Sequence, residues 1–225
     1  MTFLELRTIL AERLGSRNDL DGMIVNEMKL AQRNMERAWP ESTMPWFMVT
    51  RNTIIFDSGS GVAQIFPDFI RECDNAMTVV QRYSEDLDDF GTEVPAQKVF
   101  SEQETLAQIR DTQMVCEVDT IYSLEGTTVS IHPDAPTIVG GRAALYLTMS
   151  YYAEQPVESE TALSNAWTVN APELLIAATG RQVARYIHDG EIAAMFEQDY
   201  QMEFQKLITA NQEREISNIE MVIRS

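Results

Sequence analysis

The chain has 225 residues with 17 basic and 35 acidic side chains, so its formal net charge is -18 at neutral pH. Its length and its 44% hydrophobic content allow one sizeable core, or a main domain with an appendage. So large an excess of negative charge opposes binding to phosphate backbones and to anionic membranes, which argues against a protein that grips DNA.

The negative charge is unevenly distributed along the chain. Residues 1–37 hold six basic and six acidic side chains, which leaves 11 basic and 29 acidic side chains beyond them. The first segment is therefore neutral, and the remainder carries the whole net charge. Two interpretations stay open: the acidic surface provides solubility, or it repels a passing polyanion.

The sequence offers little support for a cofactor, a metal ion or a membrane anchor. Two cysteines, Cys73 and Cys116, and two histidines, His132 and His188, are too few for a structural zinc site. The first residues form an amphipathic run without the features of a signal peptide, and no apolar run approaches the roughly 20 residues that span a bilayer. We expect no cofactor, no metal, no membrane contact and synthesis in a cytoplasm.

The N-terminal region predicts two amphipathic helices. In residues 2–14 the apolar side chains recur at helical spacing, and Gly15 is placed to end the helix. After a polar turn, Asp19 is a candidate N-cap for a second helix that continues to about Trp39. Pro40 and Pro45 mark its end.

The middle of the chain predicts β-structure. Short β-branched or aromatic runs at residues 46–50, 53–56 and 62–66 indicate hairpins, and residues 77–83 indicate a further strand. The acidic loop at residues 85–93 is the one tempting metal site. A calcium loop beginning at Asp86 would place Phe90 and Gln97 where ligands are required, so a solvated hairpin tip is favoured.

A short helix and three more strands follow. Ser101 and Glu104 form a capping-box signature before a helix that ends near Asp111. The three strand predictions cover residues 114–123, 127–132 and 142–152. The last of these alternates apolar and polar residues, with Leu145, Leu147, Met149 and Tyr151 on one face, as expected for an antiparallel sheet with one buried side.

The C-terminal region predicts a helical hairpin and a tail. Pro172 opens one periodic run, and a second run extends to Ile208. Gly190 is expected to supply the left-handed conformation that separates the two helices. Residues 209–215 are polar, after which apolar residues return.

These patterns predict an α+β protein that is mainly helical. A four-helix bundle-like core would comprise residues 1–44 and 157–208, from which an antiparallel β-rich insert with one short helix projects at residues 45–156. Residues 209–225 would form a C-terminal docking tail.

Common catalytic motifs are missing from the sequence. It contains no nucleophile elbow, no glycine-rich dinucleotide fingerprint and no helical histidine pair, so we expect no enzyme and no catalytic residues. His188 is interpreted as a capping residue at a helix C-terminus. One enzymatic alternative stays open, a peptidoglycan-degrading glycoside hydrolase that uses paired carboxylates, because an acidic sequence has many candidates for such a pair.

Several motifs follow one another along nearly the whole chain. They are Phe3-Leu4-Glu5-Leu6-Arg7, Phe66-Pro67-Asp68-Phe69-Ile70-Arg71, Tyr151-Tyr152-Ala153-Glu154-Gln155-Pro156, Ala171-Pro172-Glu173-Leu174-Leu175 and Tyr186-Ile187-His188-Asp189-Gly190, before a long helix containing Tyr200. In their order and spacing these motifs resemble the head-to-tail adaptor, or connector, proteins of tailed bacteriophages. No single motif is diagnostic, and the β-insert matches only loosely.

The resemblance implies a virion structural protein at the head-tail junction. It would assemble in the host cytoplasm as a ring on the portal, usually of twelve copies, extend the DNA channel, and provide the platform for tail nozzle or fibre proteins. DNA would pass through without sequence-specific binding, which suits the acidic composition.

We expect the apolar tail to bind the portal or an adjacent subunit. The candidate partner-binding residues are Arg214, Ile216, Ile219, Met221, Val222, Ile223 and Arg224. Two alternatives stay open: the tail could fold back on its own bundle, and the whole chain could be a stand-alone regulatory or chaperone-like binding module.

Overall fold

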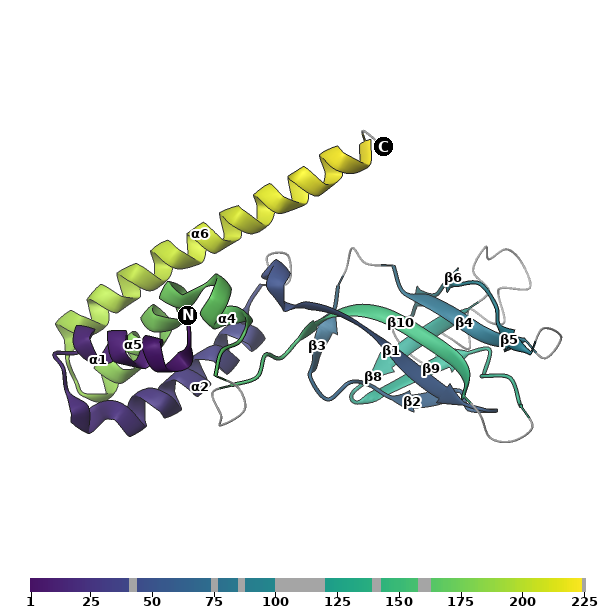
Figure 1. Ribbon diagram of the computed structural model, residues 1–225, viewed down its shortest axis with the longest axis horizontal. Coiled ribbons are helices and arrows are strands. Elements are labelled where there is room, and N and C mark those ends of the chain that lie inside the picture. Colours follow the sequence, from purple (N-terminus) through teal and green to yellow (C-terminus); the bar gives the residue numbers. More distant parts are fainter. Residues whose placement is uncertain are drawn as a thin grey trace. The chain divides into compact units, whose positions relative to one another are not determined.

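The chain divides into a helical unit and a sheet unit, each with its own core. The computed structural model describes residues 1–40, 44–73, 77–84, 88–99, 120–138, 143–157 and 163–223 (Figure 1). The helical unit comprises Met1–Met48 and Glu154–Ser225, and the sheet unit is Val49–Ala153.

The helical unit is built around α5, because α5 packs against both α2 and α6 (Figure 1). Its buried residues occur on most of its circumference, from Leu174 to Ala184. The described helices of this unit are α1 (Phe3–Arg13), α2 (Asp21–Ala38), α4 (Ala166–Asn170), α5 (Pro172–Tyr186) and α6 (Gly190–Ile223), with 3-10 turns at Asn18–Leu20 and Trp46–Met48.

The starts of α1 and α5 follow sequence signals. The Thr2 hydroxyl accepts a hydrogen bond from the Glu5 amide at 3.2 Å, and the Glu5 carboxylate accepts one from the Thr2 amide at 2.8 Å, which completes a capping box. Pro172 occupies the first turn of α5, where its missing amide costs no hydrogen bond. The helices predicted from residues 2–14, up to Trp39 and from Pro172 are confirmed by α1, α2 and α5. The N-cap predicted at Asp19 is wrong, because Asp19 lies in the 3-10 turn and pairs with Arg17 at 2.6 Å, and α2 begins at Asp21 after Leu20 without a side-chain cap.

The turn between α5 and α6 differs from the prediction. The residue with positive φ is His188, at 57°, and Gly190 is the first residue of α6. The Asp189 carboxylate accepts a hydrogen bond from the Ile192 amide at 3.0 Å, so Asp189 caps the new helix immediately after the turn. The prediction was wrong because glycine, which has no Cβ, adopts positive φ more readily than histidine, so the sequence favoured Gly190 over His188 for this conformation.

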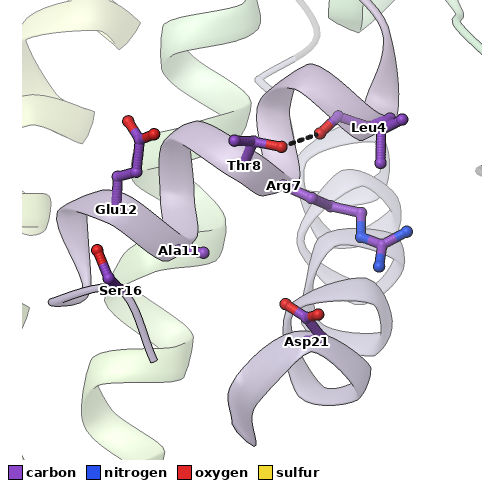
Figure 2. A pocket seen from close by; sticks show the side chains of 7 residues that line it. All are labelled: Leu4, Arg7, Thr8, Ala11, Glu12, Ser16 and Asp21. Carbon is purple, nitrogen blue, oxygen red and sulfur yellow. Dashed lines mark hydrogen bonds between the residues drawn. The ribbon is translucent and has the colours of Figure 1, made fainter. Parts of the chain in front are cut away.

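A shallow groove runs along α1 toward the start of α2 (Figure 2). It encloses about 320 Å³ and is lined by Leu4, Arg7, Thr8, Ala11, Glu12, Ser16 and Asp21. The Thr8 hydroxyl donates to the Leu4 carbonyl at 3.0 Å and thus serves the helix itself. Figure 2 shows the Glu12 carboxylate projecting away from that of Asp21.

The sheet unit contains two sheets. In the first, the order is β1-β10-β4-β5, with β3 pairing β10 and β6 pairing β4; in the second it is β2-β9-β8-β7. The described strands are β1 (Val49–Asp57), β2 (Val62–Gln64), β3 (Phe69–Glu72), β4 (Val79–Ser84), β5 (Asp89–Phe90), β6 (Val94–Pro95), β7 (Gln97–Lys98), β8 (Ile121–Glu125), β9 (Thr128–His132) and β10 (Ala143–Ala153).

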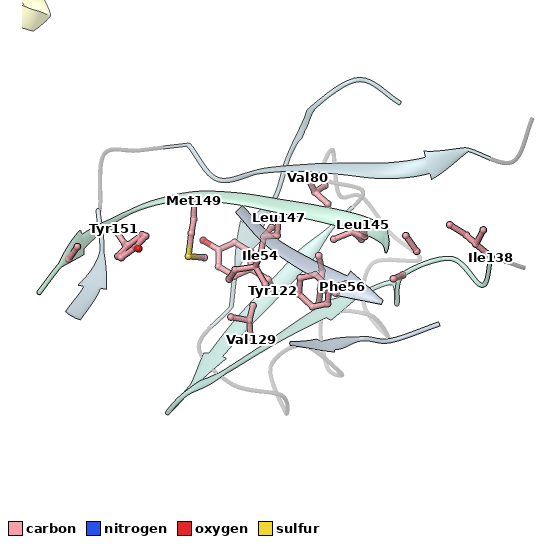
Figure 3. Close-up of a cluster of buried hydrophobic side chains, with 14 residues drawn as sticks. Ile54, Phe56, Val80, Tyr122, Val129, Ile138, Leu145, Leu147, Met149 and Tyr151 are labelled. Carbon is pink, nitrogen blue, oxygen red and sulfur yellow. The ribbon is translucent and has the colours of Figure 1, made fainter. Parts of the chain in front are cut away.

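Side chains from both sheets share one hydrophobic core (Figure 3). Leu145, Leu147, Met149 and Tyr151 of β10 are fully buried, which confirms the predicted alternation along this strand. Phe56 of β1 and several side chains from β4, β8 and β9 belong to the same cluster. The core of the sheet unit is therefore built around the central strand β10.

The prediction of a mainly helical four-helix bundle is wrong. The described residues form a mixed α/β fold with ten strands in two sheets and five helices, and the strand-rich insert dominates. The physical reason is that the strands enclose a core of their own, whereas the prediction treated them as a projection from a helical core. Helical periodicity is a strong local signal, and short strands leave a weaker one.

Two further sequence predictions are adjusted or lie outside the structure. Residues 46–48, predicted as strand, form a 3-10 turn. The end of the predicted run at 46–50 and the whole run at 53–56 belong to one continuous strand, β1. The capping-box helix predicted at Ser101 and most of the strand at 114–123 lie outside the described residues, as does part of the acidic loop after Ser84.

Candidate partner-docking helix

A line of side chains along the 34-residue helix α6 packs it against the rest of the helical unit. Phe196 is fully buried against α5, where its ring lies so close to Gly180 that an added Cβ would meet ring atoms at 2.5 Å. Two turns later, Phe204 packs on Trp39 with ring centroids 4.5 Å apart. Between them, Arg181 of α5 lies over the Tyr200 ring, with its guanidinium carbon 3.8 Å from the ring centroid.

The line of anchors continues into the stretch that the sequence suggested was a polar break. Asn211 is 6% exposed, accepts a hydrogen bond from the Trp46 amide at 3.1 Å and donates one to the Met44 carbonyl at 2.7 Å. One turn further, the Arg214 guanidinium carbon lies 3.6 Å from the centroid of the Trp46 ring. Residues 209–214 are therefore part of an anchored helix.

The predicted docking residues fall on the end of this helix. Arg214 is the last residue whose side chain is described, and it contacts the protein's own Trp46. The backbone continues as helix through Ile216, Ile219, Met221, Val222 and Ile223, whose side chains lie outside the described part, and Arg224 lies outside it altogether. The helical pattern in the sequence did not identify Asn211 as an anchor, because such a pattern is read from apolar residues only. Asn211 nevertheless follows Phe204 by two helical turns.

A buried polar network fixes the place where the chain re-enters the helical unit. Glu36 of α2 is 1% exposed, and its Oε1 accepts hydrogen bonds from Gln32 Nε2 at 3.0 Å, Trp167 Nε1 at 2.8 Å and the Gln155 amide at 3.3 Å. Its other oxygen, Oε2, is buried without a hydrogen-bond partner. Burial raises the pKa of Glu36 to about 7, against the lowering effect of these donors.

Asn165 completes the same network. Its side chain caps α4 by accepting from the Thr168 amide at 3.0 Å, and it donates to Gln32 Oε1 at 2.8 Å and to the Pro156 carbonyl at 2.7 Å. The polar groups of α2, α4 and the returning chain are thereby held together.

The motifs behind the family resemblance lie where elements of the fold contact one another. In the sheet unit, Tyr151 stacks on Phe66 with centroids 4.8 Å apart and donates a hydrogen bond to Asp68 at 2.9 Å. In the helical unit, Glu173 at the start of α5 pairs with Arg13 of α1 at 2.9 Å. These residues position elements of the fold.

The described residues were searched for other kinds of site. Within them, no three histidine, cysteine or acidic side chains are grouped so that they could hold a metal ion. No helix in the same residues combines the length and the apolar character needed to cross a bilayer. The groove along α1 is a shallow polar surface whose two carboxylates diverge (Figure 2).

Comparison of the sequence with models of known protein families and with curated proteins gives no match.

Proposed function

We propose that this chain is a structural head-to-tail adaptor of a tailed bacteriophage, which forms a ring beneath the portal, extends the DNA channel and provides the platform for tail proteins. The observation that carries the proposal is the end of α6. The helix continues for nine residues beyond Arg214, its last described anchor, and this stretch contains Ile216, Ile219, Met221, Val222 and Ile223. An apolar helical end is suited to a groove on a partner.

The charge distribution supports the same role. The sheet unit has six basic and sixteen acidic residues, and the helical unit has eleven and nineteen. Both units are therefore net negative, which favours a conduit that DNA passes without adhering to its wall.

Truncation after Glu215 tests the proposal and spares the anchors Asn211 and Arg214. We expect the truncated protein to lose from its circular dichroism spectrum only the signal of the removed helical residues, to keep its thermal midpoint, and to lose attachment to the portal of the same phage in electron micrographs. The wild-type chain should appear as a ring at one face of the portal. Unchanged attachment of the truncated protein would contradict the proposal.

A matched pair of point variants separates docking from folding. Ile219→Asp places a charge on the terminal part of α6, and Val169→Asp places the same charge at an exposed position of α4, where the side chain is 62% exposed. Only Ile219→Asp should weaken portal attachment. If it instead lowers the thermal midpoint of the isolated protein, the helix end folds back on its own unit and the docking role is wrong.

A further inference from the structure

The solvent side of α6 carries a continuous uncharged seam. Six residues alternate at spacings of three and four, and all six are exposed: Met195, Gln198, Met202, Gln205, Thr209 and Gln212. Met195 is 44% exposed and Met202 is 50% exposed. This alternation is the a/d pattern of a coiled coil, which places the residues along one line of the helix.

The charges of α6 lie beside the seam and not on it. Glu197 pairs with Arg185 at 3.1 Å, Asp199 lies 3.8 Å from Arg13, and Glu203 pairs with Lys206 at 2.6 Å. An uncharged line therefore runs along a helix whose residues 190–214 include five acidic and two basic side chains, so this part of α6 is net negative although several of its carboxylates are paired within the chain. Exposed methionine and glutamine side chains can pack against a partner helix that presents both apolar and polar side chains.

The exposed face of α2 has the complementary character. Asn26, Leu30, Arg33 and Arg37 follow each other at intervals of four, three and four residues and are exposed, Leu30 at 49%. Lys29, which is half-buried, adds a third cation, so that cations recur at every fourth position along this face, and the middle one, Arg33, also pairs with Glu154 at 3.4 Å. Leu30 and Asn26 are the apolar and amide side chains that the seam of α6 would meet.

We propose that the seam of α6 in one copy docks on the cationic face of α2 in a second copy. The inference rests on the proposed ring function and names its contact between subunits. The face of α2 from Asn26 to Arg37 is 12 residues long, about 18 Å at 1.5 Å per residue, so it fits within the 18-residue seam from Met195 to Gln212, about 27 Å. The net negative charge of α6 between Gly190 and Arg214 and the cations of the α2 face provide the charge complementarity.

The placement of the two faces fits a contact between copies. Within the helical unit α5 lies between α2 and α6, so one copy presents both faces at once (Figure 1). A contact that joins two different faces is heterologous, and repetition around an axis closes it into a ring. The portal-binding end of α6, beyond Arg214, is left free for its own partner.

A charge swap tests this contact without knowledge of its register. The seam variant carries Gln198→Lys, Gln205→Lys and Gln212→Lys, and the face variant carries Lys29→Glu and Arg37→Glu. Each should reduce the number of copies on the portal, counted by electron microscopy and mass photometry, by at least about tenfold, because like charges then meet. A mixture of the two variants should recover assembly between unlike copies.

Cross-linking tests the same contact in the absence of portal. A protein labelled with ¹⁵N and carrying Asn34→Cys is mixed at high concentration with unlabelled proteins that each carry one seam cysteine, Gln198→Cys, Gln205→Cys or Gln212→Cys, and a short thiol cross-linker is added. Mass spectrometry should find a link from residue 34 to at least one of these seam positions between labelled and unlabelled peptides. A control pair with Val169→Cys in place of the seam cysteine should give no such link.

The outcomes separate the inference from the proposed function. Rings of wild-type size that persist in both charge variants, or the absence of a link from residue 34 to any of the three seam positions, overturn the inference and leave the proposed function standing. A linked pair without any ring on the portal overturns the proposed function alone. Binding of duplex DNA that Lys29→Glu and Arg37→Glu abolish would assign the α2 face to a polyanion and also overturn the inference.

Discussion

At the scale of single residues, Glu36 is the side chain whose chemistry is most altered by the fold. Its carboxyl group is buried, one oxygen accepts three N–H donors, and the other oxygen has no hydrogen-bond partner. A neutral carboxyl group suits this site better than a carboxylate, because burial penalises the charge. Glu154, which pairs with Arg33 at 3.4 Å, contributes a further raising effect on the pKa of Glu36.

The raised pKa of Glu36 predicts that its contribution to stability declines as pH rises. The folded state binds a proton that the unfolded state releases near pH 4.5, so the contribution is complete below that pH and is lost through about pH 7. The full loss is about 3 kcal/mol, from roughly 1.4 kcal/mol per pKa unit. Glu36→Gln, which resembles the neutral acid, should remove this part of the pH dependence.

Urea unfolding followed by tryptophan fluorescence at about pH 5 and about pH 8 measures the effect, since Trp167 donates directly to Glu36. Glu12→Gln, at an exposed site of α1, is the control and should keep the wild-type dependence. An unchanged dependence in Glu36→Gln would show that Glu36 does not titrate between these values.

At the scale of elements, the contact between α5 and α6 depends on Gly180. A Cβ at this position would lie 2.5 Å from the buried ring of Phe196. Alanine is normally favoured over glycine inside a helix by roughly 1 kcal/mol, but overpacking costs about 1–3 kcal/mol. Because Phe196 has no exposed surface into which to move, we expect Gly180→Ala to destabilise the protein.

The measurement is the free energy of unfolding in urea, with Gly190→Ala as the matched control. Gly190 begins α6, and a Cβ there would meet no atom within 4 Å, so this variant should be neutral or slightly stabilising. Adding Phe196→Leu to Gly180→Ala should cost less than the sum of the separate effects. Equal effects of Gly180→Ala and Gly190→Ala would contradict the packing argument.

Sequence patterns predicted the individual helices better than their connections. The periodicity of α1, α2 and α5 located them, because their apolar side chains face a core. The end of the last helix was missed, since Asn211 is anchored through backbone groups of Met44 and Trp46 that are distant in sequence. The exposed seam of α6 also escaped notice, because glutamine and threonine at heptad spacing do not register as an apolar stripe.

At the scale of the whole molecule, the balance between the two units could not be predicted from local signals. Alternation along β10 was visible, but the joining of Leu145 and Leu147 with Tyr122 and Phe56 in one core depends on contacts between strands far apart in the chain. The predicted docking residues from Ile216 to Ile223 were found from composition alone and stay a prediction.

Net charge predicts how ionic strength controls assembly of the whole protein. Copies with a charge of -18 repel each other at long range, and this repulsion is largely screened when the Debye length falls to about 10 Å near 0.1 M salt. In the contact proposed between α6 of one copy and α2 of the next, opposite charges would lie close together, so their attraction should be screened at higher salt only. Assembly should therefore be greatest at intermediate ionic strength.

Mass photometry of the protein mixed with the portal that it is proposed to bind, at salt concentrations from about 0.01 M to about 1 M, measures this dependence. The number of copies per complex should rise to a maximum near about 0.15 M and then decline. The variant with Lys29→Glu and Arg37→Glu lacks the attractive part, so its assembly should only increase with salt as repulsion is screened. A steady decrease for the wild-type protein from the lowest salt would mean that attraction between charged faces outweighs the net charge throughout.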